Sequence, residues 1–286
     1  MTKRENPRRR EKEFAKSQER NNRYDSRKEF SREGKVNIIE EINEDLVLGR
    51  NAVIELLKSD RTIEYICLSK GDLEGSIKVI LGLAKEKGII IKEVDRRKLD
   101  AMSGGLVHQG VIAKVTPFKY CEVLDILEEA EKKNENPFIV ILDELEDPHN
   151  LGSIIRTAEL CGVHGIIIPK RRNVGVTPTV YKCSAGAIEH MRIAKVTNIN
   201  KTIDSLKELG IWVYGADMNG GYCYETNLKG PLALVIGSEG KGISKLTKDK
   251  CDVMIKIPMK GKVNSLNASV AGGILMYEIM KQRIWK

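Results

Sequence analysis

The chain has 286 residues, of which 41% are hydrophobic and only 5% aromatic, so we expect two ordinary domains with aliphatic cores. Its formal net charge is +8, and residues 1–35 hold 13 Lys or Arg against 7 Asp or Glu. No apolar run approaches the roughly 18–20 residues that span a bilayer, and the first residues form no apolar signal core. This composition argues against a membrane protein and favours a cytoplasmic one.

We interpret residues 1–44 as a basic tail outside the folded part of the chain. Its first 35 residues contribute +6 of the net charge and carry almost no apolar side chains. Such a segment buries too little apolar surface to offset the entropy of ordering, so we predict that it is disordered. The tail suits an arm that binds nucleic acid, and it equally suits a solubilising leader.

The cysteines are scattered and include no pair with the close spacing typical of metal sites. We therefore expect reduced, mostly buried thiols and no metal ion. The six residues are Cys67, Cys121, Cys161, Cys183, Cys223 and Cys251.

Residues 45–117 alternate between helical and strand patterns and predict a small α/β domain, near the lower size for independent folding. The expected helices are 51–58, 77–87 and 96–102, and the expected strands are 62–68, 89–94 and 110–115.

Residues 118–136 form a predicted linker, helical over 121–133, and residues 137–286 form a second α/β domain. Its short, all-apolar strands alternate with helices, which predicts a mainly parallel sheet covered on both faces. The expected strands are 138–142, 165–168, 211–214, 232–236 and 253–257, and the expected helices are 151–161, 201–209 and 266–283.

An unusual loop follows the first of these strands. Asn150 is placed to cap the next helix, Gly152 allows another segment to approach its first turn, and Arg156 follows six residues after Asn150. A helix N-terminus beside an arginine suits an anion site. The same residues also suit a capped helix with an ion-paired arginine.

A second loop, residues 237–244, follows the fourth strand. It has neither the spacing of a P-loop nor that of a dinucleotide site. Gly237 and its neighbouring glycines let backbone wrap closely around a ligand, and Glu239 is placed to bind Arg156 or a polar substrate group. A tight exposed turn is the alternative.

A third loop follows the last strand, which stops at Pro258. There Asn264, Ser265, Leu266 and Asn267 crowd the start of a small-residue helix, where one capping residue would suffice. Ligands of open parallel sheets bind at the carboxyl ends of the strands. We therefore expect the three loops to converge on one pocket for a polar small molecule.

These three loops resemble the sequence motifs of the SpoU (TrmH-type) RNA 2′-O-ribose methyltransferases. The N-x-G-x-x-x-R pattern stands at 150–156, the second motif at 234–242 and the third from 257 to 271. The resemblance covers about residues 138–286. The smaller domain, with residues 49–53 near its start and 108–111 near its end, resembles the substrate-binding domain of the family. The two-domain form is most similar to the RlmB branch, which methylates a guanosine ribose in 23S rRNA.

The resemblance implies a catalytic domain whose C-terminal segment threads a trefoil knot, an exception to ordinary chain topology. It implies that S-adenosylmethionine binds in the knot, contacted by Gly237, Ile257 and Leu266. It also implies a homodimer with the last helix at the interface, and RNA as the partner.

By the same resemblance, Arg156 activates the ribose 2′-hydroxyl, with Asn150 and Glu239 positioning it and the substrate, and Ser265 and Asn267 shaping the pocket. A guanidinium keeps its proton, so we favour stabilisation of the developing alkoxide while an RNA phosphate takes the proton. The sulfonium is itself a good methyl donor, so no metal is needed.

Two alternatives stay open. The same chemistry on tRNA or on another rRNA nucleotide fits the loops equally well. A non-catalytic RNA-binding assembly factor would keep the fold, but the intact Asn150, Arg156, Glu239 and Asn267 argue against it.

Overall fold

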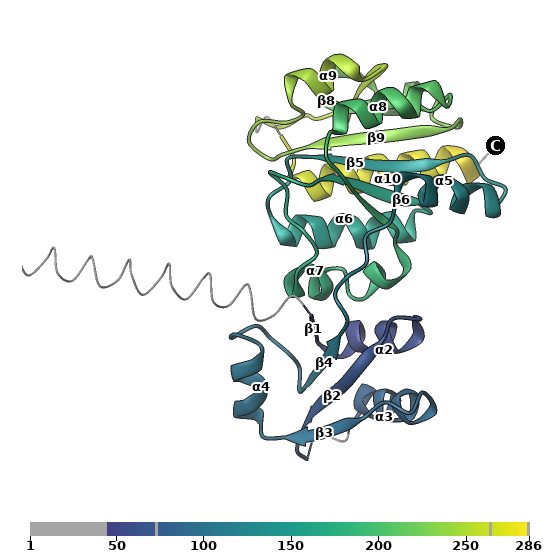
Figure 1. Cartoon of the computed structure of the whole chain (residues 1–286). Coiled ribbons are helices and arrows are strands. Elements are labelled where there is room, and N and C mark those ends of the chain that lie inside the picture. Colours follow the sequence, from purple (N-terminus) through teal and green to yellow (C-terminus); the bar gives the residue numbers. More distant parts are fainter. Residues whose placement is uncertain (1–44, 72–73, 263–264, 285–286) are drawn as a thin grey trace, which may run out of the picture. The chain divides into compact units, whose positions relative to one another are not determined.

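The computed structural model describes residues 45–71, 74–262 and 265–284. The disorder predicted for residues 1–44 and the capping role considered for Asn264 lie outside these residues. Two β-sheets form from successive stretches of the described chain (Figure 1). None of the described helices has the length and apolar character that crossing a membrane requires. All six cysteines fall within the described part and are free thiols.

The first sheet has four strands in the order β1-β4-β2-β3. β4 runs antiparallel to both of its neighbours, whereas β2 and β3 are parallel. Helices α2 and α3 bury apolar side chains against one face, and α4 places Leu99 against the other. The elements are β1 (Leu46–Leu48), α2 (Arg50–Lys58), β2 (Ile63–Ser69), α3 (Ser76–Glu86), β3 (Ile91–Val94), α4 (Arg96–Met102) and β4 (Val111–Val115).

The second sheet has six strands in the order β10-β8-β9-β5-β6-β7, and every neighbouring pair is parallel. Helix α5 (Val123–Lys132) precedes it. The strands are β5 (Phe138–Asp143), β6 (Gly165–Pro169), β7 (Ile193–Val196), β8 (Trp212–Tyr222), β9 (Leu232–Gly237) and β10 (Val253–Lys256). The helices between and after them are α6 (Pro148–Leu160), α7 (Pro178–Cys183), η1 (Ala187–His190), α8 (Ile199–Glu208), η2 (Cys223–Glu225), α9 (Lys245–Lys250) and α10 (Ala268–Ile284).

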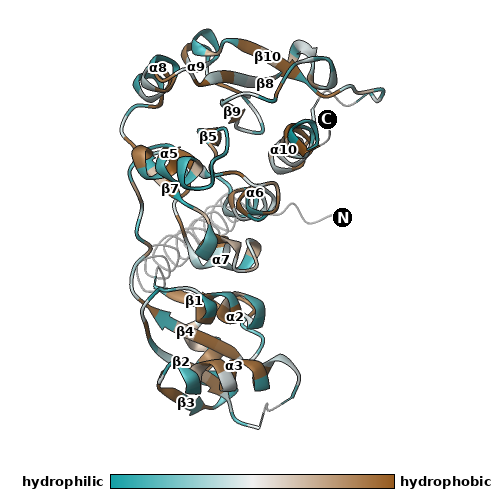
Figure 2. Cartoon of the chain, turned by 90° about the vertical axis from the view of Figure 1, so that its right-hand side faces the viewer, coloured by the Kyte–Doolittle hydropathy of each residue, from teal (hydrophilic) through white to brown (hydrophobic). Residues whose placement is uncertain are grey.

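Both faces of the second sheet are covered, as the all-apolar strands predicted. All six residues of β5 are buried. Val140 and Leu142 pack in a core that includes α6 and α10, while Ile139 and Ile141 pack with α5 and α8. Successive side chains of a strand point to opposite faces, so a strand between two helical layers is apolar throughout. Figure 2 shows the hydrophobic colour concentrated along strands such as β4 and β10.

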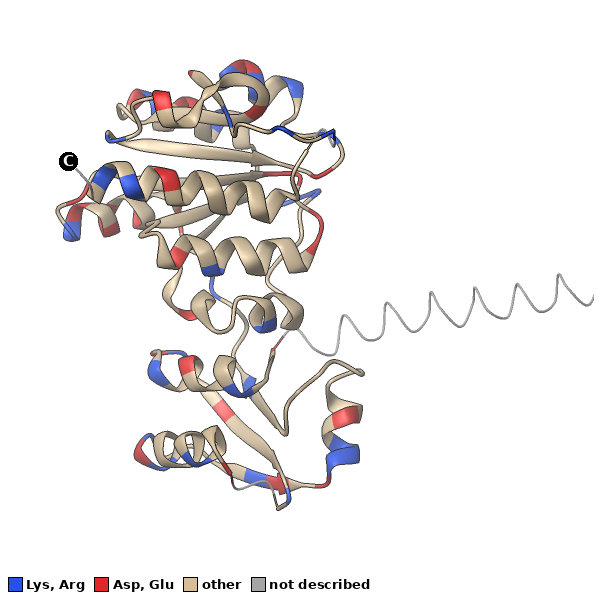
Figure 3. Cartoon of the chain, turned by 180° about the vertical axis from the view of Figure 1, so that it is seen from behind, with Lys and Arg blue, Asp and Glu red and all other residues tan. Residues whose placement is uncertain are grey.

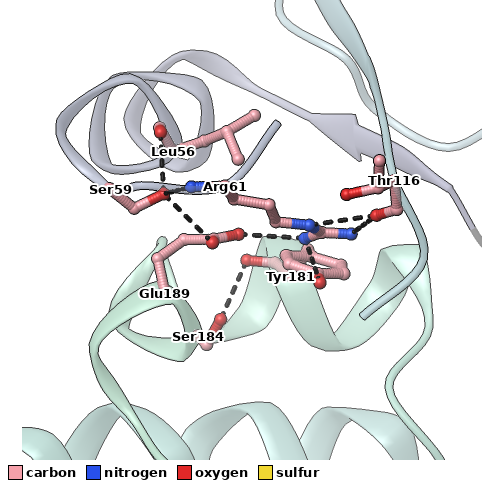
Figure 4. Close-up of polar contacts among 7 residues, drawn as sticks. All are labelled: Leu56, Ser59, Arg61, Thr116, Tyr181, Ser184 and Glu189. Atoms are coloured by element: carbon pink, nitrogen blue, oxygen red, sulfur yellow. Dashed lines mark hydrogen bonds and ion pairs between the residues drawn. The ribbon is translucent and has the colours of Figure 1, made fainter. Parts of the chain in front are cut away.

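A buried ion pair joins Arg61, in the loop between α2 and β2, to Glu189 at η1 (Figure 4). Arg61 donates from Nη1 to Glu189 Oε1 at 3.1 Å and to the Tyr181 hydroxyl, and from Nε to the Thr116 carbonyl at 3.0 Å. Ser59 Oγ donates to the other carboxylate oxygen of Glu189 at 3.3 Å. The side chains of Arg61 and Glu189 are only 11% and 4% exposed. Burial raises the pKa of Glu189 above the usual glutamate value even though Arg61 faces it.

Candidate active site

The three loops after β5, β9 and β10 meet through one hydrogen-bonded cluster of side chains. Asn150 Nδ2 donates to Glu239 Oε1 at 2.8 Å. Asn267 Nδ2 donates to Asn150 Oδ1 at 3.0 Å and also reaches Glu239 Oε1. The convergence expected at the carboxyl ends of the strands is therefore present for these three residues.

Asn150 does not cap α6, contrary to the expectation from sequence. The helix begins three residues earlier than expected, at Pro148, and Asp147 is its cap, with Oδ1 accepting from His149 N at 2.9 Å. Proline suits the first helical position because the missing N–H would have had no partner in the helix. With the cap supplied by Asp147, the Asn150 side chain points into the cluster, and the residue is only 4% exposed.

Asn267 uses both ends of its amide. Its Oδ1 accepts from Ser269 N at 3.0 Å and from Val270 N at 3.2 Å, which caps α10. Its Nδ2 faces Asn150 and Glu239. Because an aspartate in this place would cap the helix but offer no donor, the cluster requires the amide.

The glycine loop after β9 is a tight turn. Ser238 and Gly242 exchange two backbone hydrogen bonds of 3.1 and 2.9 Å, and Gly242 has a φ of +66°. A Cβ added to Gly237 would lie 2.1 Å from the backbone carbon of Gly242, so only glycine fits there. Asp143, at the end of β5, anchors the turn by accepting from Ser244 N at 2.8 Å. Sequence reasoning did not select Asp143, although a carboxylate closing an all-apolar strand is a usable signal.

A cavity of about 370 Å³ opens beside the cluster. Five of the predicted residues line it: Gly237, Glu239, Ile257, Ser265 and Leu266. Apolar side chains from β9, β10 and α10 form much of the wall, with loop backbone along the edge. Such a lining, mostly apolar with a few polar groups, is typical of sites for small organic ligands. Among the described residues no cluster of side chains suits a metal ion.

Arg156 is placed apart from the cluster within one chain. It is exposed on α6, does not line the cavity, and its side chain has no hydrogen bond or ion pair among the described residues. Glu239 instead accepts from the two asparagines. The next residue, Thr157, faces α10, because a Cβ on Gly273 would lie 3.6 Å from its methyl carbon. Arg156 therefore lies on the exposed side of α6, next in sequence to a residue that faces α10.

Family comparisons cover both halves of the described chain. The model of the SpoU rRNA Methylase family matches residues 137–277. A second model, described as RNA 2′-O ribose methyltransferase substrate binding, matches residues 46–121.

Relatives match over nearly their whole length. A protein of Bacillus subtilis (strain 168), provisionally named TrmH family tRNA/rRNA methyltransferase YacO, is 55% identical over 241 residues, which cover 84% of this chain and 96% of the relative. A protein of Staphylococcus haemolyticus with the same provisional family name is 50% identical over 242 residues, 84% of this chain and 97% of its own.

Solved structures share the fold. The SpoU methyltransferase AviRb from Streptomyces viridochromogenes, in complex with the cofactor AdoMet, gives a TM-score of 0.71 at 22% identity and covers 84% of this chain and 91% of its own. An AdoMet-bound rRNA methyltransferase from Sinorhizobium meliloti gives a TM-score of 0.69 at 22% identity, with coverage of 84% and 88%.

Proposed function

We propose that this chain, which belongs to the SpoU rRNA methylase family, transfers a methyl group from S-adenosylmethionine to the ribose 2′-hydroxyl of a guanosine in 23S rRNA. The observation that carries the proposal is the cluster of Asn150, Glu239 and Asn267 at the edge of the cavity. Three sequence-distant loops converge there, and folding alone does not call for such a cluster.

The cavity residues fit this cofactor. Gly237 lines the cavity, and because it has no side chain the backbone of Gly242 and Ile243 packs directly against it, which holds the loop backbone at the cavity edge. Ile257 and Leu266 add apolar walls against which an adenine ring can pack. S-adenosylmethionine, when bound, supplies an electrophilic methyl carbon. The crystallised AviRb complex holds AdoMet, which supports this assignment.

The chain's own residues would orient the hydroxyl and stabilise charge. Glu239, held by two asparagine amides, presents its second carboxylate oxygen to a ribose hydroxyl. Ser265 shapes the wall beside it. Arg156 would stabilise the developing alkoxide while an RNA phosphate accepts the proton, because a guanidinium keeps its own proton near neutral pH.

The experiment is methyl transfer from tritiated S-adenosylmethionine to unmodified fragments of 23S rRNA, with unmodified tRNA in parallel. We expect label on a guanosine 2′-oxygen of the rRNA. Label on tRNA or on another rRNA nucleotide would select the alternative substrate, which the names of the relatives also allow. Absence of transfer together with absence of cofactor binding would instead favour a non-catalytic assembly factor.

The Gly237→Ala variant tests the cofactor site. The added methyl group meets backbone atoms of Gly242 and Ile243 at about 2 Å, which side-chain adjustment cannot relieve. We expect cofactor affinity to fall at least about tenfold, equivalent to about 1.4 kcal/mol, as measured by calorimetry. Gly240→Ala is the matched control, because Gly240 lines the same cavity but a Cβ there meets nothing within 4 Å. Equal cofactor affinity in Gly237→Ala and the wild type would show that this loop does not form part of the cofactor site.

A homodimer through α10 is part of the proposal. Val270, Ile274 and Tyr277 recur at helical spacing and are 49%, 41% and 52% exposed. An exposed apolar stripe on one helix favours contact with another protein surface. Within the same chain, Gly272 faces Ile236 and Gly273 faces Thr157. These small residues therefore let α10 pack closely against its own chain.

We further propose the domain division into residues 45–117, 118–136 and 137–286, and a trefoil knot in the last of these. Two separate sheets and two separate family models support the division. Residues 237–242 and the segment before α10 line one cavity, and this arrangement supports the proposed knot. An RNA target and the free thiols fit a cytoplasmic location.

Deleting residues 1–35 tests the tail. If this basic segment binds RNA phosphates, the deletion should flatten the salt dependence of RNA affinity, by roughly 0.7–0.9 in log–log slope for each phosphate that the tail neutralises. The measurement is RNA affinity against salt concentration for both proteins. An unchanged slope would show that the tail does not bind the RNA phosphates.

A further inference from the structure

Two exposed tyrosines stack on each other at the end of β8. The ring centroids of Tyr222 and Tyr224 lie 5.3 Å apart, with an angle of 17° between the ring planes. The two residues are 37% and 52% exposed. Aromatic rings usually gain stability by burial, so an exposed stacked pair keeps a flat apolar face available to a ligand.

The pair lies one side chain away from the cavity. Tyr222 is in register with Lys256 of β10, and Lys256 Nζ lies 4.6 Å from the centroid of the Tyr222 ring. Lys256 also lines the cavity, as does Met218 of the same strand as Tyr222, which is 52% exposed. With the ammonium group and the second ring both against Tyr222, the more open ring is that of Tyr224.

The backbone beneath the rings is held in place. Gln282 Nε2 of α10 donates to the Cys223 carbonyl at 3.3 Å, and Thr226 Oγ1 donates to the Tyr222 carbonyl at 3.0 Å. The Cys223 side chain between the two tyrosines is buried, with the residue 4% exposed. A platform that is already ordered loses little conformational entropy when a ligand stacks on it.

Cations lie beside the platform. Lys241 and Lys256 line the cavity together with the carboxylates Asp217 and Glu239, and of these Lys256 touches the platform itself. Figure 3 shows Lys and Arg distributed along the helices and loops around the second sheet, whereas its central strands carry few charges. Unpaired RNA presents flat bases on a phosphate backbone, and proteins bind such bases on aromatic rings beside cations.

We propose that Tyr224 stacks an unpaired nucleobase of the RNA substrate next to the ribose that enters the cavity, with Tyr222 and Lys256 supporting it from behind. The inference deepens the proposed function and rests on it. It assigns a positioning role to Tyr224, and it requires the target region to be single-stranded when bound, because a paired base does not expose its ring face.

Three variants test this platform. Tyr224→Leu removes the ring, Tyr224→Phe keeps it, and Trp212→Leu removes a 56% exposed ring from the other end of the same strand. The probe is a mixed-sequence single-stranded RNA 20-mer, whose Kd is measured directly. We expect Kd to rise about 5- to 150-fold in Tyr224→Leu, the range for removing the ring beneath one stacked base, and to stay near the wild-type value in the other two.

Further readouts separate this inference from the proposed function. With the RNA that the wild type methylates, Tyr224→Leu should raise KM and leave kcat and cofactor affinity nearly unchanged. A wild type that methylates RNA together with an unchanged Kd in Tyr224→Leu would overturn the platform alone. A wild type that binds the 20-mer but methylates neither rRNA nor tRNA would overturn the proposed function. The comparison of Kd between Tyr224→Leu and the wild type would still show whether Tyr224 binds RNA.

Two more measurements address the location and the alternative occupant. RNA carrying 5-iodouridine should cross-link on irradiation to the peptide that holds Tyr224, and not to that peptide in Tyr224→Leu. Sedimentation should show the same oligomeric state for both proteins. If Tyr224→Leu instead dissociates an oligomer, the stacked pair belongs to a contact between two copies of the chain, and the inference is wrong.

Discussion

Replacing Arg156 by alanine is expected to lower kcat for methyl transfer about 100- to 1000-fold, the usual effect of removing one group that stabilises a developing oxyanion. The cofactor Kd should not change, because Arg156 is exposed on α6 and does not line the cavity. Single-turnover kinetics with saturating RNA and calorimetry with the cofactor measure the two quantities separately.

The Arg156→Lys variant serves as the matched control. Lysine keeps the charge but has no planar fork of donors, so we expect an intermediate rate if geometry matters as well as charge. Full activity in Arg156→Ala would remove Arg156 from the mechanism. Loss of cofactor binding in that variant would show that the arginine supports the fold of the cavity instead.

Replacing Arg61 by alanine is expected to lower the free energy of unfolding by about 3–5 kcal/mol, since it leaves the buried carboxylate of Glu189 without its cation. Glu189→Gln should also lower the free energy of unfolding, because it leaves the buried Arg61 cation without its anion, but by less than Arg61→Ala, since the amide oxygen still accepts from Arg61. Denaturant unfolding measures both. Lys70→Ala is the control, since its ion pair with Asp95 is mostly exposed, and it should change stability by less than about 1 kcal/mol.

The loss of stability in the Arg61→Ala variant should depend on pH. Burial raises the pKa of Glu189 and Arg61 lowers it, so removing Arg61 should raise it further. A glutamate whose pKa is higher in the folded state stabilises the fold below its unfolded pKa and loses that contribution as the pH rises through the folded pKa. The deficit of Arg61→Ala should therefore shrink as the pH falls. A deficit that is constant with pH would show that the packing of Arg61 on Tyr181, and not its charge, sets the effect.

The part of the site formed by loops after parallel strands could be predicted from sequence. Strands such as β5 and β9 are almost entirely apolar, and the carboxyl ends of parallel strands share one edge, so Glu239 and Asn150 had to come near each other. The cap of α6 was predicted wrongly. Asp147 and Asn150 are both good caps, but Pro148 suits the first helical position and so marks Asp147 as the cap, while Asn150 joins the cluster.

Two short strands and the end of a third strand were also not predicted. β1 has only three residues, and β7 is a four-residue edge strand, so neither shows a period. β8 runs to Tyr222, eight residues beyond its expected end, because it pairs with β10 in two sections separated by a register shift. The stacking of Tyr222 on Tyr224 depends on this extension, and the two residues alone suggested only surface packing.

The separation of Arg156 from the cluster follows from its spacing along the helix. Six residues place its side chain on a different side of α6 from that of Asn150, since a helix turns about 100° per residue. Asn150 faces the cluster, whereas Arg156 is exposed to solvent. If Arg156 acts on the substrate, RNA or a second copy of the chain must bring the two surfaces together.

The most direct test of the account is a map of ribose methylation in rRNA and tRNA from a strain that lacks this protein, compared with the same strain complemented by the wild-type or the Arg156→Ala protein. We predict that one guanosine of 23S rRNA loses its 2′-O-methyl group in the deletion strain, regains it with the wild type and does not regain it with the variant. Identical ribose methylation at every nucleotide in all of these strains would contradict the account.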